Sequence, residues 1–232
     1  MKLELSRVAL GKGRLGVLKG LGKTGQLSLE VPGCLLHTHL GTVPHLTQDT
    51  LSTLSTLPSV TQITLSNIAE HQEVLEEFKD GFRKFAGLHD TVLYCALHDP
   101  ATPCPTGHTT NKELEGVEVF GVVEGGDILE ERVRSAKETA KRPVSGFCLD
   151  GLQTGSMDQA LRTQLISAVT KELPEDKPRL LQGVGRPDEV LESVEAGVDL
   201  FEGFFPFEVT ERGCALIFNF NISSNPELAA SV

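Results

Sequence analysis

Four side chains of the kinds that bind zinc fall within one short stretch. Cys95, His98, Cys104 and His108 form a C-x2-H-x5-C-x3-H arrangement, and zinc accepts two thiolates and two imidazoles. Two features weigh against a metal site: Cys95 lies within an apolar run, and three prolines stiffen the following loop. We favour a proline-rich connection that binds no metal, and the zinc site stays as an alternative.

A second chemistry is anion binding at glycine-rich turns. Gly125-Gly126 precedes a predicted helix, whose N-terminus favours phosphate, and Glu124 or Glu202 would serve as general base. This pattern is compatible with an independent βα enzyme acting on a small anionic substrate. The loops that hold Glu124 and Glu202 contain no basic residue, which weighs against that hypothesis.

Composition narrows the class of protein. The 232 residues are 39% hydrophobic, enough for one large domain with a core, and no apolar run is long enough to span a bilayer. Five scattered cysteines favour free thiols in a reducing compartment. The net charge of -11 argues against an autonomous nucleic-acid binder, which normally has a basic surface.

A strand–helix–strand unit occupies residues 180–201. Pro187 suits the first turn of a helix, and Gly197 ends that helix. Val190, Leu191 and Val194 are predicted to form its apolar stripe. Loops at the carboxyl ends of strands usually carry the chemistry of such units.

The rest of the chain supplies further elements. Residues 1–29 read as β-rich, and their basic residues, Arg14 among them, are predicted to lie in solvated turns, with an RNA contact as the weaker alternative. Strands are predicted at 34–38, 60–65, 92–97, 117–123, 144–149 and 180–184. Helices are predicted at 47–54, 67–85 and 157–173, and from 127 onward. Short loops between alternating strands and helices predict a parallel α/β architecture.

Three segments carry a family resemblance: GFCLDGLQTG, ELPEDKPRLLQ and GVGRPDEVLESVEAGVDLFEGFFPFEVTERG. Together they resemble the tRNA-guanine transglycosylases, and most closely the non-catalytic accessory subunits of the eukaryotic queuine tRNA-ribosyltransferases. The resemblance implies a heterodimer that exchanges guanine for queuine at the wobble position of tRNAs with GUN anticodons, those for Asp, Asn, His and Tyr.

The resemblance also implies a TIM-barrel type fold, here incomplete and preceded by the β-rich segment. A full barrel needs about 250 residues, and a longer stretch in the family separates the counterparts of Asn111-Lys112 and residues 119–123. We therefore predict one βα-barrel-like domain over 1–220, with the junction of an internal deletion near 113–118, and a polar tail over 221–232. A splice form or truncated product would have this organisation.

Residue by residue, the family's chemistry is largely replaced. The nucleophilic Asp aligns with Glu202, the following P-T-R reads Pro206-Phe207-Glu208, and the family's D-S-G-G-F-Q string does not occur. We predict that the chain is not catalytic. The remnants of the substrate pocket are Asp150, Gly151, Leu152, Gly155, Gly183 and Gly185, and for the glycines of the first loop we favour a turn over residual base binding.

The same resemblance defines the cofactor and partners. Zinc occurs in the family, but its C-x-C-x-x-C ligand cluster is absent from this sequence, so no zinc is expected. The expected partner is the catalytic subunit, with tRNA reached through the complex and self-association as an alternative. The implied location is the cytoplasm, with peripheral association with the mitochondrial outer membrane as in the family.

Overall fold

The computed structural model describes residues 1–8, 13–88, 91–96, 117–153, 155 and 157–217. It begins with an antiparallel sheet of β1 (Lys2–Val8), β2 (Arg14–Leu21) and β3 (Leu27–Val31). A Cβ on Gly16 would lie 2.3 Å from the Glu4 carbonyl oxygen, so glycine allows β1 and β2 to approach closely. The predicted β-rich character of this segment is confirmed.

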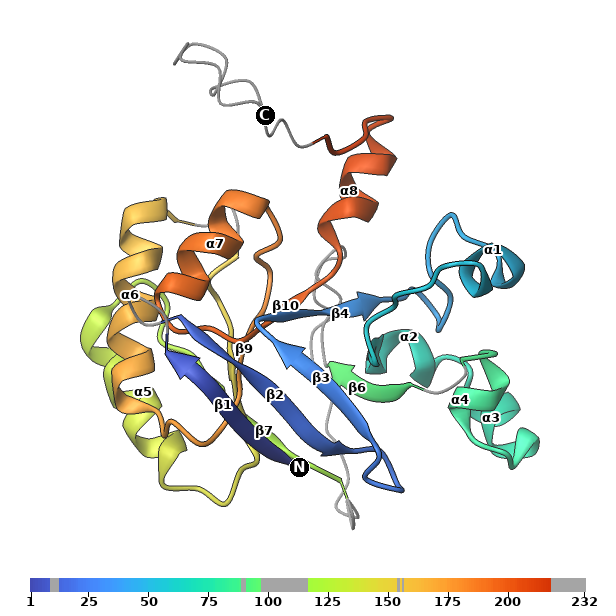
Figure 1. The fold of residues 1–232 in the computed structure, drawn as a ribbon, viewed down its shortest axis with the longest axis horizontal. Helices are drawn as coiled ribbons and strands as arrows, with labels where there is room; N and C mark the ends of the chain where they lie inside the picture. The colour runs from blue at the N-terminus through green and yellow to red at the C-terminus, as the bar shows by residue number, and fades with distance from the viewer. Residues whose placement is uncertain (9–12, 89–90, 97–116, 154, 156, 218–232) are drawn as a thin grey trace.

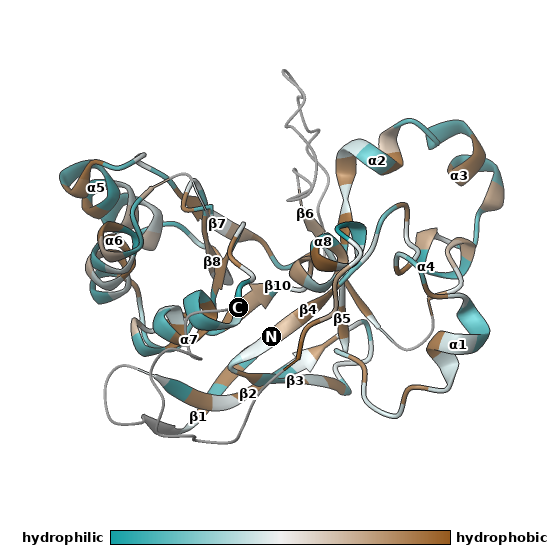
Figure 2. Ribbon diagram, turned by 90° about the horizontal axis from the view of Figure 1, so that it is seen from above, coloured by the Kyte–Doolittle hydropathy of each residue, from teal (hydrophilic) through white to brown (hydrophobic). Residues whose placement is uncertain are grey.

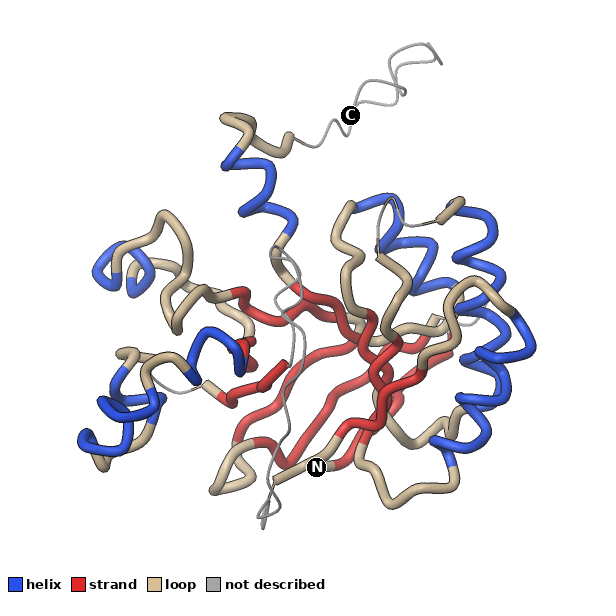
Figure 3. The backbone as a smooth tube through the Cα atoms, turned by 180° about the vertical axis from the view of Figure 1, so that it is seen from behind, coloured by secondary structure: helices blue, strands red, loops and turns tan. Residues whose placement is uncertain are grey.

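A parallel sheet of seven strands forms the centre of the molecule (Figures 1 and 3). Its strands are β4 (Gly33–His37), β5 (Val60–Thr64), β6 (Val92–Ala96), β7 (Phe120–Val123), β8 (Gly146–Leu149), β9 (Arg179–Leu181) and β10 (Leu200–Glu202). Their spatial order is β6-β5-β4-β10-β9-β8-β7. The last strand, β10, pairs with the first, β4, as a closed ring of parallel strands requires.

The ring is open between β6 and β7. These two strands follow one another in the chain, yet they are the two ends of the sheet as described. Tyr94 of β6 and Phe120 of β7 meet edge-on, with ring centroids 6.1 Å apart, but no ladder joins their backbones among the residues that the structure covers. The prediction of an incomplete TIM-barrel type α/β fold is confirmed.

Two hydrophobic clusters lie on the two faces of the sheet. Phe147, Leu149 and Leu181 face outward and pack with the helices. Cys148 and Leu180 face inward and pack with Leu18 and other side chains of the N-terminal sheet. Alternation along each strand therefore separates an outer core from an inner one, and the N-terminal sheet fills the inner one.

The helices form two groups on opposite sides of the sheet (Figure 2). The N-terminal half consists of β4–β6 with α1 (Gln48–Ser52), α2 (Leu65–Ala69), α3 (Gln72–Phe78) and α4 (Phe82–Phe85). The C-terminal half consists of β7–β10 with α5 (Leu129–Ala140), α6 (Gln159–Glu172) and α7 (Pro187–Glu195). The last helix, α8 (Phe205–Glu211), follows β10 and extends away from the sheet (Figure 1).

The prediction of one helix over 67–85 is wrong. Three short helices occupy this stretch, and the chain turns at Lys79 (φ 56°) and Gly81 (φ 84°), both left-handed. None of the three helices contains a buried residue. An amphipathic pattern without a packing partner does not sustain a long helix, because most helical stability comes from tertiary packing.

Smaller differences concern the unit at 180–201. Pro187 occupies the first turn of α7 as predicted, and Val190 and Val194 pack against the outer core. Leu191 is 68% exposed, so the prediction that it belongs to the apolar stripe is wrong. Among the helices described, none is long and apolar enough to cross a membrane.

Candidate functional site

Glu202, the predicted counterpart of the family nucleophile, lies at the carboxyl end of β10, where barrels of this type carry their chemistry. Its side chain is buried, with the residue 3% exposed. Oε1 accepts a hydrogen bond from Gln62 Nε2 (2.6 Å), and Oε2 accepts one from the Gly183 N–H (2.8 Å). The carboxylate therefore ties the end of β10 to β5 and to the loop after β9.

Arg132 of α5 holds the neighbouring loops together. Its guanidinium donates to the carbonyl oxygens of Val123 (3.2 Å), Gly126 (2.8 Å), Asp150 and Gly151 (2.8 Å). The residue is fully buried, and burial lowers its pKa from the usual value. One side chain thus satisfies carbonyls in the loops that follow both β7 and β8.

The glycines of the predicted pocket lie against the protein's own side chains. A Cβ on Gly183 would meet Gln153 Cγ at 2.3 Å, and one on Gly185 would meet Phe205 Cβ at 2.7 Å. Gly151 (φ 71°) and Gly155 (φ 79°) adopt left-handed conformations, which supports the turn role that we favoured for them. Gln153 and Phe205 therefore occupy space that a bound base would need beside Gly183 and Gly185.

Other pocket residues also have structural partners. Leu152 is fully buried in the outer core. The Asp150 side chain accepts hydrogen bonds from the Gly151 N–H (2.6 Å) and from Gln153 Nε2 (3.1 Å). The structure therefore gathers the predicted pocket residues at one end of the C-terminal half, as parts of its loops and core.

The start of α8 covers the ends of β4 and β10. Phe207 stacks between His37 (5.8 Å between centroids) and His45 (5.7 Å), and His45 Nε2 contacts Glu211 Oε1 at 2.9 Å. The resemblance predicts that Glu208 stands where the family has an arginine. The segment thus contributes aromatic packing and acidic groups, which fit poorly with a phosphate backbone.

The alternative phosphate site at Gly125-Gly126 has little support from the geometry. The Ile128 N–H, a donor at this end of the helix, already donates to the Gly125 carbonyl (3.3 Å), and Arg132 donates to the Gly126 carbonyl. Four acidic residues, Glu124, Asp127, Glu130 and Glu131, surround the start of α5 in the sequence. The nearby guanidinium is directed to carbonyls, and the acidic loop repels an anion.

The predicted zinc ligands fall mostly outside the described residues. His98, Cys104 and His108 lie in 97–116, and within the described part of the chain no cluster of three or more His, Cys, Asp or Glu residues is suited to a metal. Cys95 reaches the surface, yet partial burial raises the pKa of its thiol. A raised pKa disfavours the thiolate that zinc requires.

The opposite end of the sheet contains a buried charge cluster. Arg14 Nε lies 3.4 Å from Asp199 Oδ1, and Asp199 Oδ2 accepts from the Arg179 N–H (2.8 Å). The predicted location of Arg14 in a solvated turn is wrong, because its side chain is only 4% exposed. It also donates to the Glu175 carbonyl (2.7 Å), and it ties the N-terminal sheet to the start of β9 and β10.

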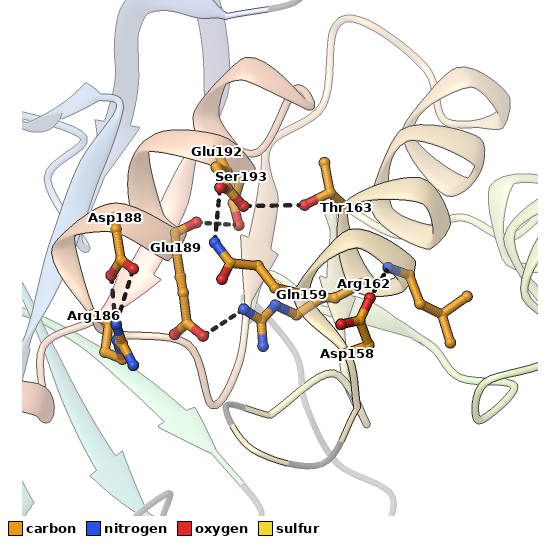
Figure 4. A network of polar contacts seen from close by, with 10 residues as sticks. Asp158, Gln159, Arg162, Thr163, Arg186, Asp188, Glu189, Glu192 and Ser193 are labelled. Atoms are coloured by element: carbon orange, nitrogen blue, oxygen red, sulfur yellow. Dashed lines mark hydrogen bonds and ion pairs between the residues drawn. The ribbon is translucent and has the colours of Figure 1, made fainter. Parts of the chain in front are cut away.

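A polar seam joins α6 to α7 (Figure 4). Arg162 pairs with Glu189, and both are buried. Glu192 accepts from Gln159 Nε2 (2.7 Å) and Thr163 Oγ1 (3.3 Å). These contacts fix the two helices side by side over β8 to β10 and position the loops that precede them.

Comparison with known proteins identifies the family. A model of the TGT family, described as queuine tRNA-ribosyltransferase, matches residues 98–227, more than half of the chain. The chain belongs to the queuine tRNA-ribosyltransferase family. The resemblance that the sequence motifs indicated is therefore confirmed.

Three relatives of this family member are named queuine tRNA-ribosyltransferase accessory subunit 2. The protein of Danio rerio is 54% identical over 301 residues, covering 100% of this chain and 72% of the relative. That of Xenopus tropicalis is 47% identical over 299 residues, covering 99% and 72%. That of Homo sapiens is 44% identical over 298 residues, covering 98% and 72%.

The alignment lengths reveal a gap inside this family member. The zebrafish alignment extends over 301 residues, whereas this chain has 232, so at least 69 aligned positions have no counterpart here. The predicted internal deletion is compatible with this difference. Its predicted junction near 113–118, and with it the domain boundaries at 1–220 and 221–232, stay predictions, since 97–116 and 218–232 lie outside the described residues.

Sequence reasoning missed three residues that organise these sites. It did not single out Gln62 or Arg132, and it did not predict that Arg14 is buried. Only Arg132 left a usable signal. It lies three residues after Leu129 and four before Ala136, which both pack in the outer core, so it interrupts an apolar helix face. A basic residue at such a position indicates a buried partner.

Proposed function

We propose that this chain is a non-catalytic subunit of a queuine tRNA-ribosyltransferase and acts beside a catalytic subunit. The observation that carries the proposal is the state of Glu202, whose two carboxylate oxygens accept hydrogen bonds from Gln62 and Gly183 inside the barrel. A nucleophile must reach the ribose carbon in a defined geometry. A carboxylate whose two oxygens accept hydrogen bonds from Gln62 and Gly183 is suited to a structural role, which is to connect β10 with its neighbours.

The name of the relatives, queuine tRNA-ribosyltransferase accessory subunit 2, supports this proposal. The charge of the chain supports it too, since a net charge of -11 leaves phosphate contacts to another protein. In the proposed complex the two subunits form a heterodimer, and this chain reaches tRNA through its partner. The substrates are the tRNAs with GUN anticodons, and the complex resides in the cytoplasm and at the outer mitochondrial membrane.

The test is co-expression with the catalytic subunit, followed by size-exclusion chromatography and incorporation of labelled guanine into tRNA. The chain alone should incorporate no label, and the co-purified complex should incorporate it. Glu202→Gln should leave the activity per complex within about twofold of the wild type. Glu208→Gln on α8 is the matched control for an acid in the same region.

One result would overturn the proposal: exchange by the chain alone that Glu202→Gln abolishes while Glu208→Gln preserves it. Circular dichroism of each variant separates a loss of folding from a loss of chemistry. The failure of the two chains to co-purify would equally count against an accessory role.

A further inference from the structure

Within the part of the chain that the structure describes, the open side of the ring presents two backbone edges that face the same gap. On β6, the Val92 N–H donates to Ser59 next to β5, so alternation places the backbone groups of Leu93 and Cys95 on the outer edge. On β7, the Val119 and Val123 carbonyls accept from the β8 side, so the backbone groups of Phe120 and Val122 face outward. Both edges belong to parallel strands, so one strand can pair with both.

The side chains beside the gap are apolar and incompletely covered. A Cβ on Gly121 would point at Thr139 of α5, and Val123 lies in the outer core; Val122 therefore faces the inside of the ring. It is nevertheless 43% exposed. Cys95, which faces outward on β6, is also exposed, because no described helix covers that strand.

The number of described strands indicates how many residues would be needed to close the ring. An eightfold barrel has one strand more than the seven described here. About 250 residues in eight units give roughly 30 residues per βα unit. The gap of at least 69 positions is therefore long enough for one strand with a helix on either side.

We propose that the β6 and β7 edges form a docking site for one helix–strand–helix unit supplied by another polypeptide. The occupant has an apolar strand that runs parallel to β6 and β7 and covers Val122 from inside the ring. Its preceding helix covers Cys95. The positions of the zebrafish relative that have no counterpart here are numerous enough to form such a unit, and a second copy of this chain does not contain them. The proposal does not depend on the proposed function, because it concerns only the ring.

The probe is a recombinant peptide that comprises the stretch of the zebrafish relative opposite the gap in this chain. Added at about 100 times its dissociation constant, it should raise the melting temperature of the full chain by about 5–10 °C. It should also lower the light scattering of the chain, because the edges are then paired. A peptide with two prolines in its strand is the control and should do neither.

Two variants of the chain localise the site. Val122→Lys should weaken binding of the peptide at least tenfold, because it places a charge on the apolar wall of the gap. Leu191→Lys is the matched control on α7, where Leu191 is 68% exposed and remote from the gap, and it should bind the peptide as the wild type does. Circular dichroism and a thermal melt without peptide establish that both variants fold.

Four results would overturn the proposal. The peptide fails to bind the wild type, or the proline-containing peptide binds equally well, or Val122→Lys binds as tightly as Leu191→Lys. A stable dimer of the chain that excess peptide does not dissociate would assign the edges to a second copy instead, and would overturn it as well.

Discussion

The two halves of the parallel sheet differ in what covers them. In the C-terminal half, α5–α7 enclose side chains such as Val123, Leu165 and Val169 that are fully buried. In the N-terminal half, Leu51 is the one buried residue that the four short helices contribute, and Val74, Phe78 and Phe85 stay more than 40% exposed. The strands alone therefore do not determine stability, since each half depends on its outer layer.

The difference follows from the position of the opening. The C-terminal half retains each helix that follows β7, β8 and β9, so its loops are tied by Arg132 and by the Arg162–Glu189 pair. The N-terminal half ends at β6, before the predicted junction near 113–118. We infer that the N-terminal half, whose strands are covered by short helices, is less stable than the C-terminal half, whose strands keep α5–α7.

The largest effect that we expect is from Arg132→Ala, which should lower the free energy of unfolding by about 3–5 kcal/mol. The substitution removes the buried donor of four carbonyls at the end of β7 and in the loops after β7 and β8. Arg134→Ala on the same helix is the control, because Arg134 is exposed and pairs with Glu131 on the surface, and it should change stability by less than about 0.5 kcal/mol. Urea unfolding measures both; equal effects would mean that Arg132 does not hold the C-terminal half together.

The second prediction concerns Asp199, which joins the N-terminal sheet to the barrel. Burial raises its pKa to about 6 despite the facing Arg14 and Arg179. The folded protein therefore binds a proton at this site between about pH 4 and pH 6, where the unfolded chain does not. The contribution of Asp199 to stability should fall by about 3 kcal/mol as the pH rises through that window.

The measurement for Asp199 is the unfolding free energy of the wild type minus that of Asp199→Asn, taken from pH 4 to pH 7. Subtraction removes the titration of the other carboxyl groups as far as the two proteins share it. The difference should decrease with rising pH. A difference that increases with pH would show that Arg14 and Arg179 lower the pKa of Asp199 instead.

The third prediction compares one phenylalanine from each half. Phe78 is 41% exposed and contacts Phe85 edge-on at 5.4 Å, so Phe78→Ala should cost no more than about 1 kcal/mol. Phe147 is fully buried in the outer core, and Phe147→Ala should cost about 3–5 kcal/mol. Similar losses for the two variants would contradict the contrast between the halves.

The smallest effect that we expect is that of zinc removal. The purified chain should contain no stoichiometric zinc after dialysis, and chelation should not shift its melting temperature. Elemental analysis tests this directly. Tightly bound zinc that is lost in Cys104→Ser and His108→Ala would instead indicate a metal site near β6. Such a site would stabilise the N-terminal half.

The sequence by itself determined the features that depend on neighbouring residues. Alternating apolar runs and amphipathic stretches predicted the β-rich start and the βα units, and Pro187 marked the start of α7. The motifs around Glu202 predicted the family and, through it, a TIM-barrel type fold. These signals are local, because backbone geometry and side-chain periodicity act over a few residues.

Only the tertiary structure decided which residues meet across the chain. Gln62 and Glu202 are 140 residues apart in sequence, and Arg14 contacts a carbonyl 161 residues away. The predicted helix at 67–85 is three short helices, none of which contains a buried residue. Among the described strands, β6 and β7 are the two ends of the parallel sheet. Burial and pairing of this kind depend on long-range packing, which overrides local propensity.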